Sequence, residues 1–229
     1  MEIERTAVGE PYQEFYGYEE LGVFHSQAEI DAYKNSSGAL IQPNAKPGDF
    51  KWADLDGDGT ITTNDRKFLG QSIPPYTYGV NLSATYKQFD LKIFGQGVWG
   101  NMIAQDYRRL DYPGSNYQIA ALNAWTPANP NSNYPRLTDN DPNGNFKNFS
   151  NFYLQSGAYF RIKNLQLGYT LPQELSKSVN MKNVRIYAGV NNLATITKYN
   201  GYDPEISGGI DEGIYPQART FVLGLNVSL

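Results

Sequence analysis

The sequence predicts an all-β fold, and three observations lead to this prediction. Period-two alternation of apolar and polar residues is strong in several separated segments, whereas helical periodicity is weak almost everywhere. The composition includes 18 tyrosines, 11 phenylalanines and 22 glycines, which suits strands and turns better than helices. Short turns and long loops alternate between the expected strands. Together these features indicate antiparallel β-structure with long loops.

The first two expected strands form a hairpin. From Tyr76 to Lys87, the even-numbered positions are apolar or aromatic and the odd-numbered positions are small or polar. A second strand begins at Phe89, after a tight turn around Gln88, and alternates in the same way. The apolar face of the first strand is expected to contain Tyr76, Tyr78, Val80, Leu82, Ala84 and Tyr86.

The third expected strand contains an irregularity. It runs from about Tyr159 to Leu171, after a loop of roughly 50 residues. Phe160 and Ile162 are out of phase with Leu165, although all three are apolar. An extra residue in the strand would restore the phase, so we expect a β-bulge near Asn164.

The last two expected strands are separated by another long loop. One begins at Val184 and continues to about Tyr199, after a short connector that starts at Pro172. The other runs from Thr220 to Leu229 and alternates without a fault. Short turns on one side and long loops on the other are typical of outer-membrane barrels. A soluble β-sandwich or soluble barrel also alternates and stays an alternative at this point.

Charge and composition exclude several classes of protein. The 229-residue chain has a formal net charge of -4 and scattered lysines and arginines, so we expect no nucleic-acid binding. It contains no cysteine, which excludes disulfides and thiolate metal sites. No segment approaches the roughly 18 apolar residues that a membrane-spanning helix needs. A membrane protein with this sequence would therefore have to cross the bilayer with strands.

The sharpest local motif is an acidic stretch that matches the spacing of an EF-hand-type calcium loop. Three aspartates occupy its first, third and fifth positions, and Gly59 stands at its sharp turn. The position where glutamate normally binds calcium with both oxygens holds an aspartate, as in dockerin-type loops. The predicted ligands of a structural calcium ion are Asp54, Asp56, Asp58, Thr60 through its carbonyl, Thr62 and Asp65. The alternative is an acidic surface turn stabilised by aspartate side chains.

Enzyme chemistry is not expected from this sequence. The single histidine, His25, has no recognisable triad around it. Asp203 and Glu205 bring two carboxylates close together, but they lie in a glycine- and proline-rich loop that implies no pocket. We therefore predict that the protein is not an enzyme and has no catalytic residues.

A series of short motifs covers essentially the whole chain. The motifs lie at residues 8–11, 15–18, 47–50, 54–65, 78–81, 86–90, 96–101, 125–127, 135–137, 159–165, 167–172, 191–193 and 199–205. No single motif is decisive, but so many in one order make chance or convergence improbable. Taken in order, they resemble the end of the SusC/RagA family of TonB-linked transporters.

The resemblance implies a fold: the carboxy-terminal strands of a large antiparallel transmembrane β-barrel with long extracellular loops. Residues 1–75 would form an extracellular loop region with the acidic loop, and residues 76–229 the last five barrel strands with two long outer loops. The final Leu229 departs from the aromatic residue usual in the family. The apolar positions of the first strand would face lipid, and Asn81, Ser83 and Thr85 would face the lumen.

The resemblance also implies a function in the cell outer membrane. The family imports oligosaccharides or peptides, is driven through TonB, and works beneath a SusD-like lipoprotein. TonB would be contacted through an amino-terminal part that this sequence does not contain. The alternative is a standalone secreted β-domain that is stabilised by calcium and binds carbohydrate. The two hypotheses differ in the sheet edges, because an independent domain must hide both of them.

Overall fold

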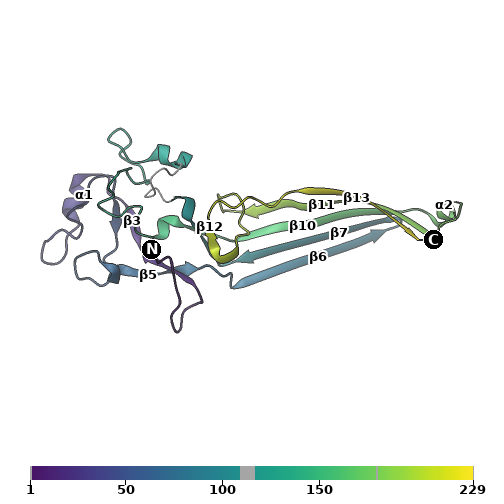
Figure 1. Cartoon of the computed structure of the whole chain (residues 1–229), viewed down its shortest axis with the longest axis horizontal. Helices are drawn as coiled ribbons and strands as arrows, with labels where there is room; N and C mark the ends of the chain where they lie inside the picture. The colour runs from purple at the N-terminus through teal and green to yellow at the C-terminus, as the bar shows by residue number, and fades with distance from the viewer. Residues whose placement is uncertain (1, 109–116, 179, 229) are drawn as a thin grey trace. The chain divides into compact units, whose positions relative to one another are not determined.

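The computed structural model describes residues 2–108, 117–178 and 180–228, and the regular secondary structure of these residues is mostly β-strand (Figure 1). The all-β prediction is confirmed, and the helices α1 (Gln27–Ala32) and α2 (Gln173–Ser178) are short. In the described ranges every helix is too short or too polar to span a membrane. The chain divides into two compact units. The first comprises Met1–Ile73, Met102–Gln155 and Gly208–Gly213, and the second comprises Pro74–Asn101, Ser156–Ser207 and Ile214–Leu229.

The second unit is built on a five-stranded antiparallel sheet with the strand order β13-β11-β10-β7-β6. All five strands predicted from the sequence are present, with ends close to those expected. They are β6 (Tyr76–Tyr86), β7 (Phe89–Trp99), β10 (Tyr159–Thr170), β11 (Asn183–Thr197) and β13 (Thr220–Ser228). Leu229, the predicted last residue of the final strand, lies outside the described residues.

Strands β6 and β7 form the predicted hairpin. Tyr86 lies opposite Phe89, and Leu82 lies opposite Ile93. The tight turn contains Lys87 with a φ of 54°, in the left-handed region that two-residue hairpin turns require. Because opposite residues in an antiparallel pair share a face, the apolar positions of both strands gather on the same side of the sheet.

The predicted bulge is present in β10, and a second bulge, which was not predicted, lies in β11. Ile162 pairs with Gly95 and Asn164 with Phe94, so Lys163 is an extra residue relative to β7. On the other side, two residues of β11, Asn192 and Leu193, face Lys163 alone. Asn192 has a φ of 53°. The bulge in β10 brings the apolar residues before and after it onto one face, as the alternation required.

The first unit contains short strands and loops. Its strands form three small sheets, in the orders β1-β2-β5, β12-β8-β9 and β3-β4. The strands are β1 (Glu4–Arg5), β2 (Glu14–Tyr18), β3 (Glu20–Val23), β4 (Phe50–Trp52), β5 (Arg66–Gln71), β8 (Met102–Gln105), β9 (Leu154–Ser156) and β12 (Ile210–Asp211). Short 3-10 helices lie at Thr63–Asp65, Asp106–Arg108, Ile119–Asn123, Asn151–Tyr153 and Ser207–Gly209. This unit thus assembles segments that the sequence analysis placed in the long loops.

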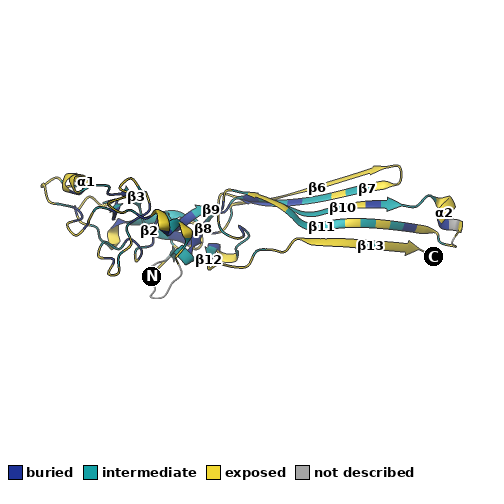
Figure 2. Ribbon diagram, turned by 90° about the horizontal axis from the view of Figure 1, so that it is seen from above, coloured by how far each residue is buried: buried dark blue, intermediate teal, exposed yellow. Residues whose placement is uncertain are grey.

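The two units differ in their cores. In the first unit, aromatic side chains such as Phe15, Phe50 and Trp52 are fully buried and pack in small clusters. In the second unit, β6 and β13 are exposed along almost their whole length (Figure 2). The long sheet therefore leaves an apolar face uncovered.

Candidate functional site

The acidic loop brings three of its predicted ligands together. Carboxylate oxygens of Asp54, Asp56 and Asp58 all lie within 4.8 Å of one another. Two oxygens that bind one calcium ion at about 2.3–2.6 Å are separated by at most roughly 5 Å. The three carboxylates are therefore close enough to share one ion.

Backbone groups hold this arrangement in place. The two Asp54 carboxylate oxygens accept hydrogen bonds from the N–H groups of Gly57 and Gly59, each at 2.9 Å. Gly57 and Gly59 have φ values of 74° and 85°, which explains the choice of glycine at these turns. An ionised carboxylate has about four acceptor positions, so these hydrogen bonds leave lone pairs for a cation.

The structure gives Asp65 and Thr62 a role in closing the loop. Asp65 is fully buried, and its two oxygens accept hydrogen bonds from Leu55 N–H at 2.8 Å and Thr62 N–H at 2.6 Å. The Thr62 hydroxyl accepts from Asn64 N–H at 3.1 Å, which completes a capping box at the short helix Thr63–Asp65. The Thr60 N–H and hydroxyl both donate to Asp58 at 2.8 Å. Calcium binding by all six predicted ligands stays a prediction.

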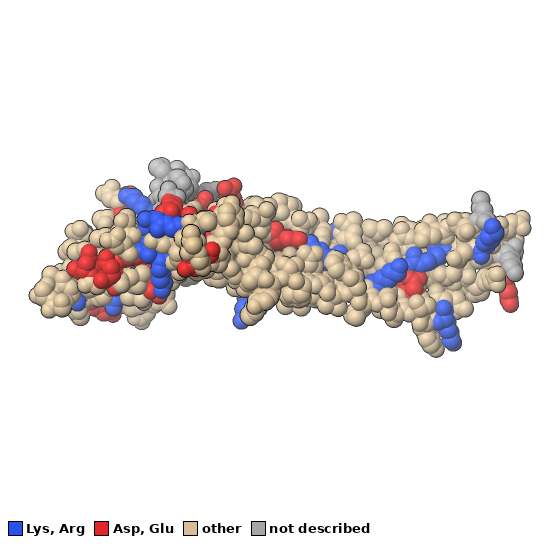
Figure 3. Space-filling view, turned by 90° about the horizontal axis from the view of Figure 1, so that it is seen from below, with Lys and Arg blue, Asp and Glu red and all other residues tan. Residues whose placement is uncertain are grey.

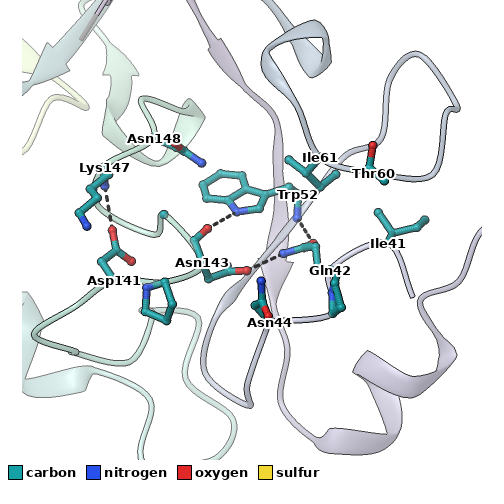
Figure 4. Close-up of a pocket in the computed structure, with 13 residues that line it drawn as sticks. Ile41, Gln42, Asn44, Trp52, Thr60, Ile61, Asp141, Asn143, Lys147 and Asn148 are labelled. Atoms are coloured by element: carbon teal, nitrogen blue, oxygen red, sulfur yellow. Dashed lines mark hydrogen bonds between the residues drawn. The ribbon is translucent and has the colours of Figure 1, made fainter. Parts of the chain in front are cut away.

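A hollow of about 480 Å³ lies beside the acidic loop and shares Thr60 and Ile61 with it (Figure 4). Its floor is held together by amide groups. The Trp52 indole N–H donates to the Asn143 carbonyl at 2.9 Å, and the Gln42 amide donates to the Asn143 side-chain oxygen at 2.9 Å. Because Trp52 is almost fully buried, its ring offers no stacking surface to a sugar.

A buried ion pair joins two segments of the first unit that are far apart in the sequence. Arg136 donates from Nε and Nη2 to the two oxygens of Asp49, at 2.6 and 3.1 Å. Asp49 is fully buried, and it also accepts from the Asn145 side chain at 2.8 Å. A Cβ atom on Gly48 would lie 2.6 Å from the Trp125 ring. The family-like motifs at 47–50, 125–127 and 135–137 therefore meet here, a role that the sequence analysis missed because the motifs are far apart in the chain.

The five-stranded sheet of the second unit has one apolar and one polar face. The register places the predicted apolar positions of β6 on the same side as those of the other four strands. Leu82 is 59% exposed on this face and Leu223 is 81% exposed. The opposite face of the sheet carries Ser83, Lys92, Gln166 and the Asp90–Arg185 pair, whose atoms are 2.6 Å apart at the closest.

The two carboxylates near residue 204 are tied to cations. Arg161 donates to Asp203 at 2.5 Å and to Glu205 at 2.8 Å, and Lys163 donates to both Glu205 oxygens. Burial raises the pKa of Asp203, but hydrogen bonds from Arg161 and from the backbone outweigh it and hold this pKa below its usual value. A carboxylate held in its ionised form in this way is poorly suited to act as a general acid.

The single histidine is anchored by the backbone. The Nδ1 atom of His25 lies 2.8 Å from the Pro130 carbonyl oxygen, and the His25 N–H donates to Glu29 at 2.8 Å. In the described part of the chain, no nucleophile is hydrogen-bonded to this ring.

Comparisons with known proteins identify the family. No family model matches the chain. A TonB-dependent receptor of Formosa agariphila is 36% identical over 232 residues, which cover 96% of this chain and 22% of the receptor. TonB-dependent receptor SusC of Bacteroides thetaiotaomicron is 30% identical over 190 residues, covering 82% of this chain and 18% of SusC. This chain is a homologue of the TonB-dependent receptors of the SusC/RagA type. The family resemblance that the motifs predicted is confirmed.

Solved structures agree with this assignment. The RagAB peptide importer in its open-open state matches with a TM-score of 0.72 and 26% identity, covering 94% of this chain and 22% of that chain. A second RagAB peptide transporter structure shares the fold, with a TM-score of 0.77 and 24% identity over 99% of this chain and 23% of that one. This chain spans about a fifth of the length of the curated relatives it matches.

The family also confirms the predicted location. SusC/RagA-type TonB-dependent receptors are outer-membrane β-barrel proteins, so the chain is assigned to the cell outer membrane. The matched proteins are named as receptors, importers and transporters, not as enzymes.

Proposed function

We propose that this chain forms five neighbouring strands and the attached outer loops of a barrel that imports oligosaccharides or peptides across the outer membrane. The observation that supports this proposal most strongly is the uncovered apolar face of the five-stranded sheet. Monomeric soluble proteins rarely expose contiguous apolar patches larger than a few hundred Å². Lipid is the partner that a continuous apolar strand face of this length fits best.

Aromatic side chains at both ends of the apolar face support a membrane position. Tyr76 stacks on Trp99 with ring centroids 5.5 Å apart at one end of the hairpin. Phe89 packs against Tyr169 at 4.8 Å at the other end. Transmembrane barrels carry such aromatic girdles at the two water interfaces of the lipid. The strand segments between these aromatic pairs would then cross the hydrocarbon region.

The edges of the sheet favour a barrel over a standalone domain. In the described residues, β6 and β13 form the two edges of the five-stranded sheet, and neither is covered by a further strand. Unpaired backbone groups are tolerated neither in lipid nor along long flat strands in water. Neighbouring strands of the same large barrel would pair both edges. The alternative of a secreted, calcium-stabilised carbohydrate-binding domain would leave these edges open.

The partners follow from the same proposal. A SusD-like lipoprotein would act with this protein at the outer surface, and TonB would drive import through a part of the receptor outside this chain. Oligosaccharides and peptides are the proposed substrates, and SusC and the RagAB peptide importer are the similar proteins that support them. The outer loops of both units would be the parts of this chain that meet substrate and lipoprotein.

Uptake by cells tests the transport proposal. Full-length receptor, produced with its lipoprotein in a strain that lacks both, should restore uptake of labelled oligosaccharides or peptides. Dissipating the proton-motive force should abolish that uptake. Restored uptake that is insensitive to this treatment would contradict a TonB-driven mechanism.

We also propose that the acidic loop binds one structural calcium ion. The ligands would be Asp54, Asp56, Asp58 and Asp65, with Thr60 and Thr62 completing the shell. The grouping of the first three carboxylates supports this proposal, and the ion would offset their mutual repulsion.

Titration calorimetry with calcium on the full-length protein tests the calcium proposal. Asp56→Ala should abolish the binding heat, because it removes an oxygen ligand from the three-carboxylate group. Asp139→Ala, which removes an exposed carboxylate of the same unit, should leave the heat unchanged. Equal heats from the wild type and from Asp56→Ala would reduce the motif to an acidic turn.

A further inference from the structure

The second unit contains a hollow that the sequence analysis did not anticipate. It has a volume of about 370 Å³, within the range of roughly 300–1,000 Å³ that is usual for ligand pockets. Part of its wall is the loop with Asp203, which the sequence placed in a region without a pocket. Its polar lining includes Arg161, Thr195, Thr197, Tyr202, Gln217 and Arg219.

The unpredicted bulge in β11 helps to build this hollow. Asn192 lines it and has the positive φ of 53° that non-glycine residues rarely adopt. Its side-chain amide donates to the Ala218 carbonyl at 3.0 Å, which fixes the backbone directly before Arg219. Bulges are over-represented next to functional sites because they re-aim side chains. The backbone irregularity and the hollow thus occur at the same place.

The charged groups in the inner part of the hollow are paired with one another. Arg161 is 3% exposed and donates to Asp203, to Glu205 and to the Thr195 hydroxyl. The second oxygen of Asp203 accepts from Gln217 N–H at 2.9 Å. These groups satisfy one another's charges and hydrogen bonds, and they hold the loop in place. They therefore leave no unpaired charge for a ligand.

The rim of the hollow carries a cation without an acidic partner. Among the described residues that line the hollow, Arg219 is exposed and forms no ion pair with an acid. The Thr195 oxygen accepts from Arg161, so its own proton is free to donate. Tyr202, 72% exposed, adds another hydroxyl. Arg219 and these two hydroxyls can therefore all donate hydrogen bonds to one anionic group.

We propose that this hollow is a binding site for a carboxylate group of a transported ligand. Arg219 supplies the charged contact, and the hydroxyls of Thr195 and Tyr202 supply further donors. The planar guanidinium of arginine matches a carboxylate in a two-point hydrogen-bonded geometry. The carboxylate belongs either to an acidic sugar or to the end of a peptide. This inference rests on the proposed transport function and names a substrate class for it.

Calorimetry with matched probes on the purified full-length receptor tests the carboxylate site. The peptide pair is a tripeptide with a free terminal carboxylate and the same tripeptide as its amide. The sugar pair is a trisaccharide of galacturonate and one of galactose. Arg219→Gln removes the charge, Arg219→Lys keeps it, and Lys92→Gln removes an exposed charge of β7 that does not line the hollow.

We expect the wild type to bind at least one carboxylate probe roughly three- to tenfold more tightly than its neutral match. Arg219→Gln should abolish this preference, Arg219→Lys should retain part of it, and Lys92→Gln should retain all of it. A preference confined to one pair supports the site and identifies the source of the carboxylate. A wild type without any preference, or an Arg219→Gln variant that keeps it, would overturn the proposal.

Uptake of the neutral probes separates this inference from the transport proposal. If the carboxylate site is wrong but the protein is a transporter, the wild type should import the neutral probes although calorimetry shows no carboxylate preference that depends on Arg219. Absence of uptake of all four probes by the wild type would count against both proposals.

Discussion

The two compact units of this chain stabilise themselves in different ways. The first unit buries aromatic clusters and joins distant loop segments through buried polar pairs such as Asp49 and Arg136. The second unit has regular strands but leaves the apolar side chains of its sheet exposed. Both units belong to one chain, so the difference in burial between them shows which side chains find their contacts within this chain. The loops contact partners within the chain, whereas the apolar face and the two edges of the sheet have no partner among the described residues.

The largest expected effect is on the isolated chain. Without further strands and lipid, the sheet exposes its apolar face and two unpaired edges, so we expect the chain to aggregate or to require detergent. Gel filtration in plain buffer, followed by a thermal melt, measures this. A monodisperse monomer with a sharp melt would mean that the second unit completes itself, and it would favour the standalone-domain alternative.

The next largest effect is expected in the first unit, at its buried ion pair. Replacing Arg136 with methionine leaves the fully buried Asp49 carboxylate without its cation, which typically costs about 3–5 kcal/mol. Hydrogen exchange of the segments around residues 46–52 and 134–146, measured by mass spectrometry on the full-length protein, should rise strongly.

The control for this change is a partly exposed ion pair in the same unit. It joins Lys67 Nζ and Glu19 Oε2, which lie 2.7 Å apart. Lys67→Met should cost less than about 1 kcal/mol, because solvent screens such pairs. Similar increases in exchange for both variants would show that the burial of Asp49 does not matter.

In the second unit, the comparison concerns two neighbouring positions of β6. Arginine at Leu82 would lie on the apolar face, and this costs about 2–4 kcal/mol near the middle of a bilayer. Arginine at Ser83 would lie on the polar face, so its cost should be much smaller. The folded fraction of each full-length variant in the outer membrane can be measured by its heat-dependent mobility in gels. Equal losses would mean that the two faces are not divided between lipid and lumen.

The difference between the units also decides what the sequence could predict. Alternation is a local signal, so it predicted the five strands, the hairpin turn and the bulge in β10 from neighbouring residues alone. The ion pair between Asp49 and Arg136 joins positions 87 residues apart, and no local sequence pattern predicts such a contact. The resemblance to a family identified the motifs that contain both residues, but it did not show that they meet.

The candidate sites follow the same division. The spacing of the acidic loop predicted that Asp54, Asp56 and Asp58 lie together, because they are close in sequence. It could not show that Asp65 closes the loop through Leu55 and Thr62, since this depends on the folded path of the backbone. The hollow beside Arg219 depends on a left-handed asparagine and on a returning loop. Asparagine adopts a positive φ more readily than most residues. This preference is the one feature of the sequence that could have indicated the left-handed residue beside the hollow.

The smallest expected effect is the pH response of the loop that holds Asp203. The folded-state pKa of Asp203 is lowered, so its ionised form stabilises the folded loop at any pH above the ordinary value of about 3.9. This contribution is lost only as the pH falls through the lower, folded-state pKa. Lys163 and Arg161 also contact Glu205, so Asp203 is not the sole contact that holds the described loop.

In the full-length protein, covalent labelling of the segment around residues 200–217 should be constant from about pH 7 to pH 5 and should rise below about pH 4. Asp203→Asn should raise the labelling at neutral pH and flatten its dependence on acid. If labelling of the wild type already rises between pH 7 and pH 5, a group with a higher pKa controls this loop, and the ion pair with Arg161 is not what holds it.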